Sequence, residues 1–407
     1  MHEVAPGTSP SLPTVLLKPG DADRVVAGHP WIYEGAILRV TQAIADGEVV
    51  QVKDHRQRLL GTGVFNSKSK IHVRLLSPER EDLDQDFFER RIRAAVAVRE
   101  RHMPGTTCRR VVNAESDRLS GVIVDQYGDV LVLQISSLGM DLRKALIVAA
   151  LQKVLKPRAI IERSDAGSRK FEGLTESSGL LAGEPVERIE ATVGAIKYDI
   201  DLKGGHKTGI YLDQQLNHLA VAKFAKDAAV LDCFSFLGGF ALHAAQAGAR
   251  HVLGLDQSED AVAAARANAQ RHGLASCEFE AANVFDWLKS HTSVAPNERL
   301  LPKFDLIILD PPSFTRNRAA VEDALRGYKE IHLRALKLLK PNGVLATFCC
   351  SHHVDSRLFE DVILSAAFDT HKVLRRVATY SQSPDHPVVP SIPETEYLKG
   401  YAYEVLS

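Results

Sequence analysis

Two strand ends in the last third of the chain carry side chains that could take part in chemistry. The first is an apolar run, residues 344–348, that ends in Cys349 and Cys350. Neighbouring residues of a strand point to opposite faces, so only one of these thiols can face a ligand. Because a thiolate is a strong nucleophile, Cys350 is a candidate for covalent catalysis. The alternative is a buried structural cysteine, which is the stronger interpretation for Cys349.

The second strand end is the apolar run 306–310, which closes on Asp310 and continues into Pro311 and Pro312. Two prolines stiffen the turn and remove two amide donors. A carboxyl group held in this way could bind the polar edge of a ring or exchange a proton with it. We therefore select Asp310 as a second candidate for catalysis.

The short cluster Cys349, Cys350, His352 and His353 also raises the question of a metal site. Structural zinc sites separate their ligands by gaps of two or more residues, and this cluster lacks such gaps. We therefore expect no metal.

An earlier strand end has the pattern of a nucleotide site. Residues 230–240 form a strand that closes on Asp232, followed by a glycine-containing turn that opens a helix. Phe236 stands where the dinucleotide pattern G-x-G-x-x-G requires glycine, which argues against NAD. A turn of purely structural use is the alternative. The candidate cofactor residues here are Asp232, Phe234, Ser235 and Gly238.

Two further strand ends follow at the expected spacing. Asp256 comes 24 residues after Asp232 and is followed by Gln257; an acid at about this distance can bind the hydroxyls of a ribose. Asn283 and Val284 follow the next strand, where we expect Asn283 to face the amino group of an adenine. A helix-capping role is the alternative for Asp256, and the Asn-x-Phe triplet is weak evidence alone. Together the three ends indicate a class I methyltransferase, which uses S-adenosylmethionine.

The elements that must position these residues are strands alternating with helices from about residue 191 onward, which predicts a mainly parallel sheet. The fold class is therefore α/β, with a class I Rossmann-like methyltransferase domain. We predict a disordered tail over 1–13, a small β-barrel over 14–80, a central α+β domain over 81–190 and the methyltransferase domain over 191–407.

Composition restricts the class of protein further. The chain has 407 residues, 45% hydrophobic and 25% charged, as in ordinary globular proteins. We find no apolar run of membrane-spanning length and no secretory signal. Five cysteines do not make a disulfide framework in a chain of this size, so we expect a reducing compartment and a cytoplasmic location.

Several motifs, taken in order, resemble the ribosomal RNA large subunit methyltransferase I family. They are His-Pro-Trp-Ile-Tyr at 29–33, Lys-Thr-Gly-Ile-Tyr-Leu-Asp-Gln at 207–214, Asp-Pro-Pro-Ser-Phe at 310–314, Phe-Cys-Cys-Ser at 348–351 and Tyr-Leu-Lys-Gly at 397–400. The resemblance runs from about Leu16 to the C-terminus. It implies an N-terminal PUA domain, which is an RNA-binding barrel, and S-adenosylmethionine-dependent formation of 5-methylcytosine in large-subunit (23S) ribosomal RNA.

The resemblance also implies roles for individual residues. Tyr211 and Gln214 belong to the segment that leads into the cofactor site, and the family's Ser-Cys-Ser pattern selects Cys350 as the nucleophile. Addition of the thiolate to carbon 6 of cytosine makes carbon 5 nucleophilic, while Asp310 would hold the edge that carries ring nitrogen 3. Two residues depart from the family: Asn283 replaces an acid near the adenine, and Ser313 replaces a lysine. The base that removes the carbon 5 proton is not evident.

The partner implied is RNA, and an arginine-rich stretch offers a surface for it. Residues 53–110 hold 14 Lys and Arg against 8 Asp and Glu, although the whole chain has a formal net charge of −1. A local basic surface can bind a phosphate backbone, whereas the alternative is a solvated helix face paired with acids. The arginines proposed for this surface are Arg90, Arg91, Arg93, Arg99 and Arg101.

Two other functions remain open on the sequence. A sister branch of the same fold makes 7-methylguanine without a thiol at this position, and a catalytically idle RNA-binding assembly factor is the third hypothesis. The oligomeric state is also open, a homodimer included.

Overall fold

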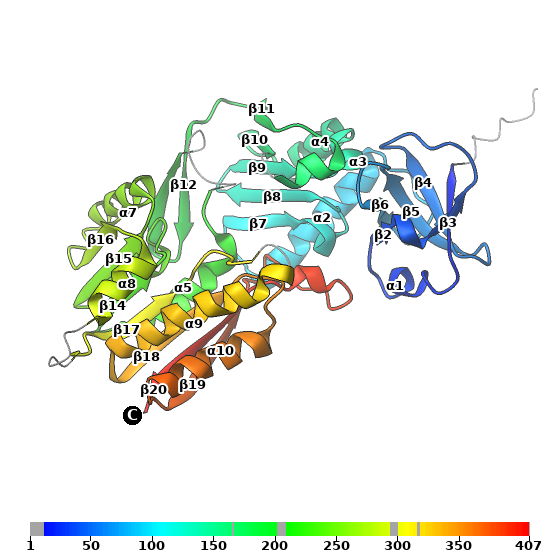
Figure 1. Ribbon diagram of the computed structural model, residues 1–407. Coiled ribbons are helices and arrows are strands. Elements are labelled where there is room, and N and C mark those ends of the chain that lie inside the picture. The colour runs from blue at the N-terminus through cyan, green and yellow to red at the C-terminus, as the bar shows by residue number, and fades with distance from the viewer. Residues whose placement is uncertain (1–11, 165–166, 202–208, 294–299, 316–317, 407) are drawn as a thin grey trace, which may run out of the picture. The chain divides into compact units, whose positions relative to one another are not determined.

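The computed structural model describes residues 12–164, 167–201, 209–293, 300–315 and 318–406 (Figure 1). The chain divides into two compact units, one formed by 1–189, 201–209 and 384–395, the other by 190–200, 210–383 and 396–407. The tail predicted over 1–13 lies outside the described residues except for Leu12 and Pro13.

The first unit begins with a six-stranded sheet in the order β2-β6-β5-β4-β1-β3. Val15, Leu17, Val50 and Val52 are fully buried and form its core with the short helix α1 (Asp23–Val26). The residues between them, Leu16 and Gln51, are buried as well, so both faces of β1 and β4 are covered here. The strands are β1 (Thr14–Leu17), β2 (Trp31–Tyr33), β3 (Ile37–Val40), β4 (Val49–Lys53), β5 (Leu59–Phe65) and β6 (Ile71–Ser77).

The same unit continues with a five-stranded sheet in the order β11-β10-β9-β8-β7, packed on three helices. Its core includes Phe87, Phe88 and Ile92 on the inner face of the longest helix. The strands are β7 (Cys108–Asn113), β8 (Val122–Tyr127), β9 (Val130–Ile135), β10 (Ala159–Ser164) and β11 (Ser177–Gly183), and the helices are α2 (Gln85–His102), α3 (Leu138–Asp141) and α4 (Lys144–Leu155).

The arginines of α2 do not form the single basic surface that the sequence predicts. Arg99 is fully buried, donates to Asp117 at 2.6 Å and to the carbonyl oxygens of Arg110 and Asp385, and so cannot contact RNA. The reason is helical spacing, because Arg99 follows the buried Ile92 and Ala95 on the same face. The prediction is therefore wrong for Arg99. Of the others, Arg90 and Arg91 pair with Glu81, Arg93 pairs with Glu89, and Arg101 is exposed.

The second unit contains a seven-stranded sheet in the order β16-β15-β14-β17-β18-β20-β19, in which β20 runs antiparallel to both neighbours. The strands are β14 (Ala229–Cys233), β15 (His251–Asp256), β16 (Cys277–Ala281), β17 (Phe304–Leu309), β18 (Leu339–Cys349), β19 (Leu374–Ser381) and β20 (Lys399–Val405). A two-stranded sheet, β12 (Arg188–Val193) with β13 (Ile196–Asp201), precedes it.

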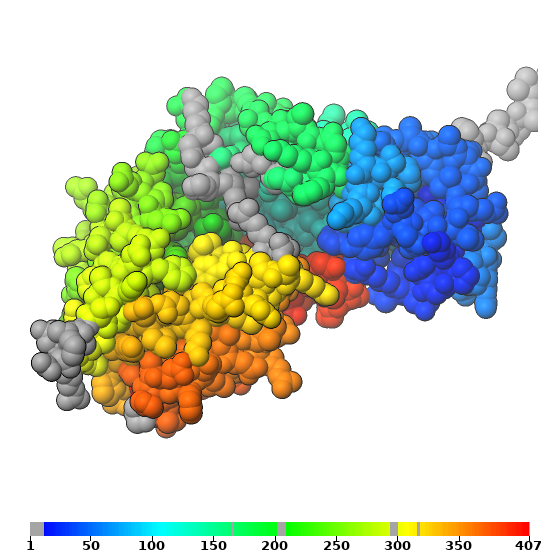
Figure 2. Space-filling view, viewed as in Figure 1, coloured from blue at the N-terminus to red at the C-terminus, as the bar shows by residue number. Residues whose placement is uncertain are grey.

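Among the described residues, six helices accompany this sheet. Helices α9 and α10 lie side by side, and their surfaces are continuous in the space-filling view (Figures 1 and 2). Their inner faces, with Tyr328 and Phe359, pack on β17, β18 and β20. The helices are α5 (Gln215–Ala222), α6 (Gly239–Gln246), α7 (Glu259–Arg271), α8 (Val284–Thr292), α9 (Val321–Leu338) and α10 (Ser356–Asp369).

Strand order places the functional edge of the sheet. β14 pairs in parallel with β15 on one side and with β17 on the other. The chain adds β15 and β16 on one side of β14 and then crosses to the other side to add β17, so the order of the strands reverses at β14. Ligands of open α/β sheets bind beyond the carboxyl ends of the strands at such a switch point. The carboxyl ends of β14 and β17 are therefore where a ligand site is expected.

In the part of the chain that is described, no helix combines the length and the apolar character of a membrane span.

Candidate functional site

The carboxyl ends of the parallel strands bring together most of the residues selected from the sequence. Asp232 lies at the end of β14, Asp256 ends β15, Asp310 directly follows β17 and Cys350 directly follows β18. Parallel pairing in register sets these ends side by side at one edge of the sheet. The strand ends selected for cofactor binding, those of β14 to β16, therefore lie next to the strand ends selected for catalysis, those of β17 and β18.

The turn after β14 is held in a conformation that side chains rarely adopt. Phe234, Phe236 and Gly238 have φ angles of 68°, 49° and 83°. A left-handed conformation costs a residue with a side chain about 1–2 kcal/mol. Asp256 offsets part of this cost, because its Oδ2 accepts a hydrogen bond from the backbone N–H of Phe236 at 2.9 Å and its Oδ1 accepts one from Ser258 at 2.9 Å. Strain of this kind is typical of ligand-binding turns.

Two buried polar atoms at this turn have no protein partner within the described residues. Asp232 is fully buried; its Oδ2 accepts from the N–H of Ala241 at 2.9 Å, whereas its Oδ1 accepts nothing. The hydroxyl of Ser235 is also buried and unpartnered. Burial raises the pKa of Asp232 well above its usual range, and Asp310 and Asp256 add to the effect. A ligand that donates hydrogen bonds and carries positive charge would satisfy these atoms. S-adenosylmethionine, with its ammonium and sulfonium groups, fits this requirement.

Gly238 and Gly254 have no side chains, which leaves room for the ring of Phe279 beside this turn. A Cβ atom at Gly238 would lie 2.8 Å from the Phe279 ring, and one at Gly254 would lie 2.4 Å from it. The ring therefore packs directly on the backbone of both strand ends. Packing against Phe279 therefore explains why glycine is required at both positions.

The end of β16 differs from the arrangement predicted for an adenine. The side-chain oxygen of Asn283 caps α8 by accepting from the N–H groups of Phe285 at 3.0 Å and Asp286 at 3.3 Å. Both lone pairs are then used, so a contact to an exocyclic amine needs another atom. Val284 is 3% exposed and packs in the core. Gln257 is exposed beside Asp256.

An aromatic cluster lines the same edge; the sequence singled out its Phe234 and, as the alternative to Val284 beside an adenine, its Phe285, but not Phe314. The ring of Phe285 lies 6.5 Å from that of Phe234 and 5.6 Å from that of Phe314, centroid to centroid. All three rings are half-buried. Phe314 also packs on Tyr328 at 4.6 Å and approaches the helical Gly327. Partly exposed aromatic faces are suited to stacking against an adenine or a target base.

A chain of side-chain amides fixes the carboxyl group of Asp310. Asn217 donates to the carbonyl oxygen of Ser381 at 2.9 Å and to Gln214 Oε1 at 2.6 Å. Gln214 then donates from Nε2 to Asp310 Oδ1 at 3.0 Å. Burial raises the pKa of Asp310 to about 7, Asp213 adds to this effect, and the Gln214 hydrogen bond opposes it. The carboxyl group is therefore poised to hold or release a proton near neutral pH.

The two adjacent cysteines differ sharply in their surroundings. Cys349 is fully buried in the core of the sheet, whereas Cys350 is half-buried. The Cys350 thiol points to the carbonyl oxygen of Pro311, with 3.9 Å between sulfur and oxygen. The thiol therefore lies against the rigid turn that follows Asp310.

Tyr211 connects the two sides of the edge. Burial raises the pKa of its phenol to about 12, and the charges of Asp213, Asp310, Cys350 and Asp256 contribute in that order. Its ring meets that of Phe236 edge-on at 5.2 Å. Lys207 and Thr208, from the same motif, lie outside the described residues.

Sequence reasoning missed two polar residues of this edge. Asn217 supports Gln214, and Lys399 of β20 stands opposite Cys349 in the sheet and donates to backbone carbonyls directly after Cys350. The resemblance included Lys399 but gave it no role. Neither residue has a local signal, because each acts through long-range pairing.

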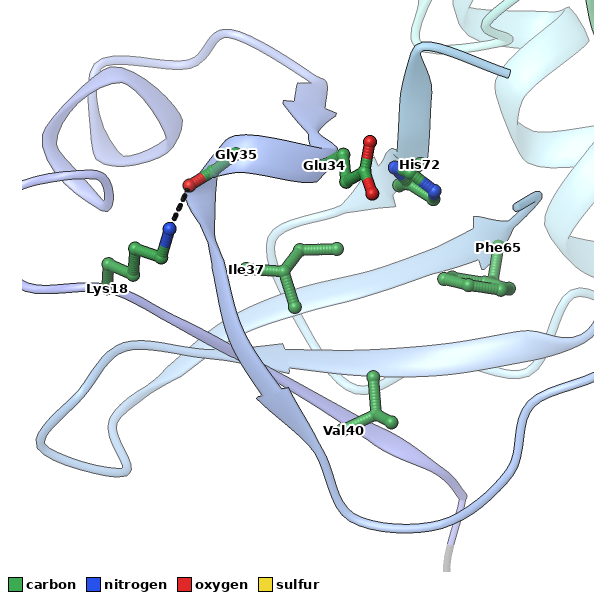
Figure 3. A pocket seen from close by; sticks show the side chains of 7 residues that line it. All are labelled: Lys18, Glu34, Gly35, Ile37, Val40, Phe65 and His72. Carbon is green, nitrogen blue, oxygen red and sulfur yellow. Dashed lines mark hydrogen bonds between the residues drawn. The ribbon is translucent and has the colours of Figure 1, made fainter. Parts of the chain in front are cut away.

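The first unit carries a separate pocket of about 530 Å³ on the six-stranded sheet (Figure 3). Figure 3 shows Lys18 and Gly35 at one end and Phe65 and His72 at the other. The Lys18 ammonium donates to the carbonyl oxygen of Gly35 at 2.7 Å, and the rings of Phe65 and His72 lie 5.8 Å apart. A cation and aromatic rings that line one pocket are a combination found in single-stranded nucleic-acid sites. Glu34 adds a carboxyl group to the same lining.

Comparisons with known proteins agree with these observations. Residues 15–78 match the family described as PUA-like domain, and residues 171–396 match the family described as S-adenosylmethionine-dependent methyltransferase. The chain is 37% identical over 405 residues to the ribosomal RNA large subunit methyltransferase I of Klebsiella pneumoniae strain 342, covering 98% of this chain and 100% of that protein. It is 36% identical to the protein of that name from Salmonella arizonae, with coverage of 98% and 99%.

Solved structures share the fold. A putative S-adenosylmethionine-dependent methyltransferase from Streptococcus mutans superposes with a TM-score of 0.80 at 22% identity, covering 96% of this chain and 100% of that one. The putative methyltransferase SMU.776, solved in complex with SAH, gives a TM-score of 0.81 at 23% identity with the same coverage. The α/β fold with an N-terminal PUA-like domain, expected from the sequence, is confirmed. The chain is an S-adenosylmethionine-dependent methyltransferase and belongs to the ribosomal RNA large subunit methyltransferase I family.

Proposed function

We propose that this protein methylates carbon 5 of a cytosine in large-subunit ribosomal RNA, with Cys350 as a covalent nucleophile. The relatives' name supports the RNA substrate. The observation that carries the choice of atom is the half-buried Cys350 thiol, which lies 3.9 Å from the Pro311 carbonyl oxygen in the turn that follows Asp310. Transfer to an amino group or to guanine nitrogen 7 has no use for such a thiol.

The cofactor, when bound, supplies the electrophilic methyl group. Asp232 Oδ1 and the Ser235 hydroxyl are the unpartnered acceptors that would hold its polar part, and Asp256 would hold the ribose hydroxyls. Phe285, rather than the buried Val284, is the residue of its strand end that can meet the adenine ring.

Replacing Asp256 by asparagine is expected to weaken S-adenosylmethionine binding by about 10- to 100-fold. Removing a charged acceptor costs roughly 1.5–3 kcal/mol, and the variant also loses one of the two backbone hydrogen bonds that Asp256 accepts, from Phe236 and from Ser258. Isothermal titration measures the effect. Asp260→Asn, which changes an exposed acid in the first turn of α7, is the matched control and should bind normally. Equal affinities in the two variants would remove Asp256 from the site.

Catalysis would then depend on two side chains of this protein. The Cys350 thiolate adds to carbon 6 of cytosine, and the electron pair of the carbon 5–carbon 6 double bond becomes available at carbon 5. The Asp310 carboxyl, protonated near neutrality, donates to ring nitrogen 3 and stabilises the charge that develops there. Carbon 5 takes the methyl group and loses its proton to a base, and the sulfur–carbon 6 bond breaks to restore the ring and the thiolate.

A cytosine cannot reach a half-buried thiol from inside a helix, so it must be single-stranded or flipped from its stack. We assign initial RNA binding to the PUA-like sheet, whose pocket offers Lys18 together with two aromatic rings.

Reversing the charge at this pocket with Lys18→Glu is expected to weaken RNA binding by about tenfold at low salt and to lower the salt dependence of binding by about one charge. The exposed Lys18 ammonium lies at the mouth of the pocket, where it is free to approach a phosphate while it bonds Gly35. Filter binding across a salt series provides the measurement. Lys70→Glu, an exposed lysine of the same sheet that does not line the pocket, should show little change.

The proposed product is tested by digesting RNA methylated in vitro to nucleosides and identifying the new base by mass spectrometry. We expect 5-methylcytosine. The appearance of 7-methylguanine would reject the proposal in favour of the sister activity. Absence of any product, together with no binding of S-adenosylmethionine, would support an idle assembly factor. The five free cysteines are compatible with the cytoplasmic location that we continue to propose.

A further inference from the structure

Lys399 pairs in the sheet with the residue that precedes the candidate nucleophile Cys350. It lies on β20 directly across the sheet from Cys349, at the last pair of the β18–β20 ladder. Its ammonium group donates to the carbonyl oxygen of Ser351 at 2.7 Å and to that of Val354 at 2.6 Å. These carbonyls belong to the bend that joins β18 to α10. Lys399 therefore ties the backbone that follows Cys350 to the neighbouring strand.

Several groups around Cys350 disfavour a negative charge on its sulfur. Its sulfur faces the carbonyl oxygen of Pro311, which favours the neutral thiol as a donor over the thiolate. The negative charges of Cys350 and Asp310 both raise the pKa of the Tyr211 and Tyr328 phenols, so these groups lie close enough to interact. A negative sulfur is unfavourable beside such groups unless a cation is near.

Lys399 is such a cation. Burial lowers its pKa, whereas Cys349, Cys350, Asp355 and Glu396 raise it in that order. An attraction between a thiolate and an ammonium acts on both partners, so the same interaction that raises the pKa of Lys399 favours the ionised sulfur. The two short bonds to carbonyl oxygens keep the ammonium in place.

We propose that Lys399 is a positioning residue for Cys350: it fixes the 351–354 bend that presents the sulfur, and its positive charge promotes formation of the thiolate. This inference rests on the proposed role of Cys350 as the nucleophile. It nevertheless makes a claim about the thiol itself, which can be measured without RNA and without cofactor.

The test is the rate of alkylation of Cys350 by iodoacetamide in the full chain between pH 6 and pH 10, followed by peptide mass spectrometry. The other four cysteines are buried, so labelling reports mainly on Cys350. Lys399→Met should slow alkylation at pH 7 by about tenfold and move the pH midpoint upward by about one unit, since a nearby opposite charge shifts a titration by roughly one to three units. Lys399→Arg should restore much of both.

Two further variants separate charge from structure. Lys399→Gln keeps donors for the two carbonyls but carries no charge, so it should shift the midpoint like Lys399→Met. Lys372→Met is the matched control, because Lys372 is also a partly buried lysine that donates to a carbonyl, that of Leu339 at 2.8 Å, and it should leave alkylation unchanged. If the uncharged variants do not fold, high salt should still raise the midpoint of the wild-type chain, by less than one unit because a partly buried pair is screened less than an exposed one.

A midpoint that stays the same in Lys399→Gln, or in salt where the variants are unfolded, would overturn the inference. The proposed function can fail separately, because an active Cys350→Ala variant would reject covalent catalysis while leaving a shifted alkylation midpoint in place.

Discussion

Replacing Cys350 by alanine is expected to abolish methyl transfer, with a loss of about 10³-fold or more, and to leave binding of S-adenosylmethionine unchanged. Removing a covalent nucleophile typically eliminates almost all of the rate that the catalytic group supplies. Cys350 lies outside the packed core, so its truncation should cost little stability. Transfer of labelled methyl to RNA and isothermal titration with the cofactor measure the two effects in the same preparation.

Cys349→Ala is the control that separates chemistry from packing. Cys349 is fully buried beside Tyr328, and its truncation should cost about 1 kcal/mol of stability while activity is retained. RNA containing 5-fluorocytosine gives an independent readout. Fluorine takes the place of the carbon 5 proton and a base cannot remove it, so the covalent adduct should persist. We expect this adduct with Cys349→Ala and none with Cys350→Ala. Full activity of Cys350→Ala would exclude the covalent mechanism.

The parallel half of the sheet could be predicted because its signals are local. Strands over 230–232, 252–256 and 306–310 were expected, and the structure has β14, β15 and β17 at these places with ends that differ by at most two residues. These strands are buried on both faces and read as continuous apolar runs. The acids that end them mark the carboxyl edge, so the sequence also located Asp232, Asp256 and Asp310.

The C-terminal part of the sheet could not be predicted in this way. β19 is an edge strand with mostly exposed residues and shows no apolar alternation. β20 is placed by antiparallel pairing with β18, about fifty residues earlier in the chain. Lys399 therefore had no local signal that would connect it with Cys350.

Helix periodicity and capping explain what the structure shows at two of the residues selected from the sequence, and the contact of Asn283 with the cofactor stays a prediction. Asn283 stands where a helix N-cap is expected, since it precedes the amphipathic stretch of α8, and its oxygen is used there. Arg99 stands seven residues after the buried Ile92, on the inner face of α2. In both positions, a side chain that was assigned to a ligand instead satisfies backbone groups of its own fold.

Replacing Asp310 by asparagine is expected to lower the rate of methyl transfer by about 10²- to 10⁴-fold, the usual contribution of a positioned proton donor. In the wild-type chain the loss of the Asp310 proton near pH 7 should oppose the gain from ionisation of Cys350, so the rate of the chemical step should pass through a maximum and then fall. The variant should lack this decrease, because its amide does not titrate. Single-turnover rates at saturating cofactor, measured from pH 5.5 to 9, check both statements.

The same carboxyl group also makes stability depend on pH with a defined sign. Its pKa is raised from 3.8 to about 7 in the folded chain, so the stability it contributes is present below pH 3.8 and is lost as pH rises through 7. Asp310→Asn should therefore raise the melting temperature relative to wild type at pH 8, by about 2–4 °C for each kcal/mol recovered, and should have little effect below pH 4.

Asp305, five residues earlier and at the start of β17, is the control of opposite sign. Burial raises its pKa. The N–H of Ala229, Lys340 and Arg250 lower the pKa by more than burial raises it, so the net pKa lies below the usual value. Its contribution to stability is present above pH 3.8 and is lost as pH falls, so Asp305→Asn should destabilise the chain at pH 8. A rate that rises through pH 7 in the wild-type chain, and no longer does so in Asp310→Asn, would mean that Asp310 acts as a base. It would then be assigned to removal of the carbon 5 proton, and nitrogen 3 would need another donor.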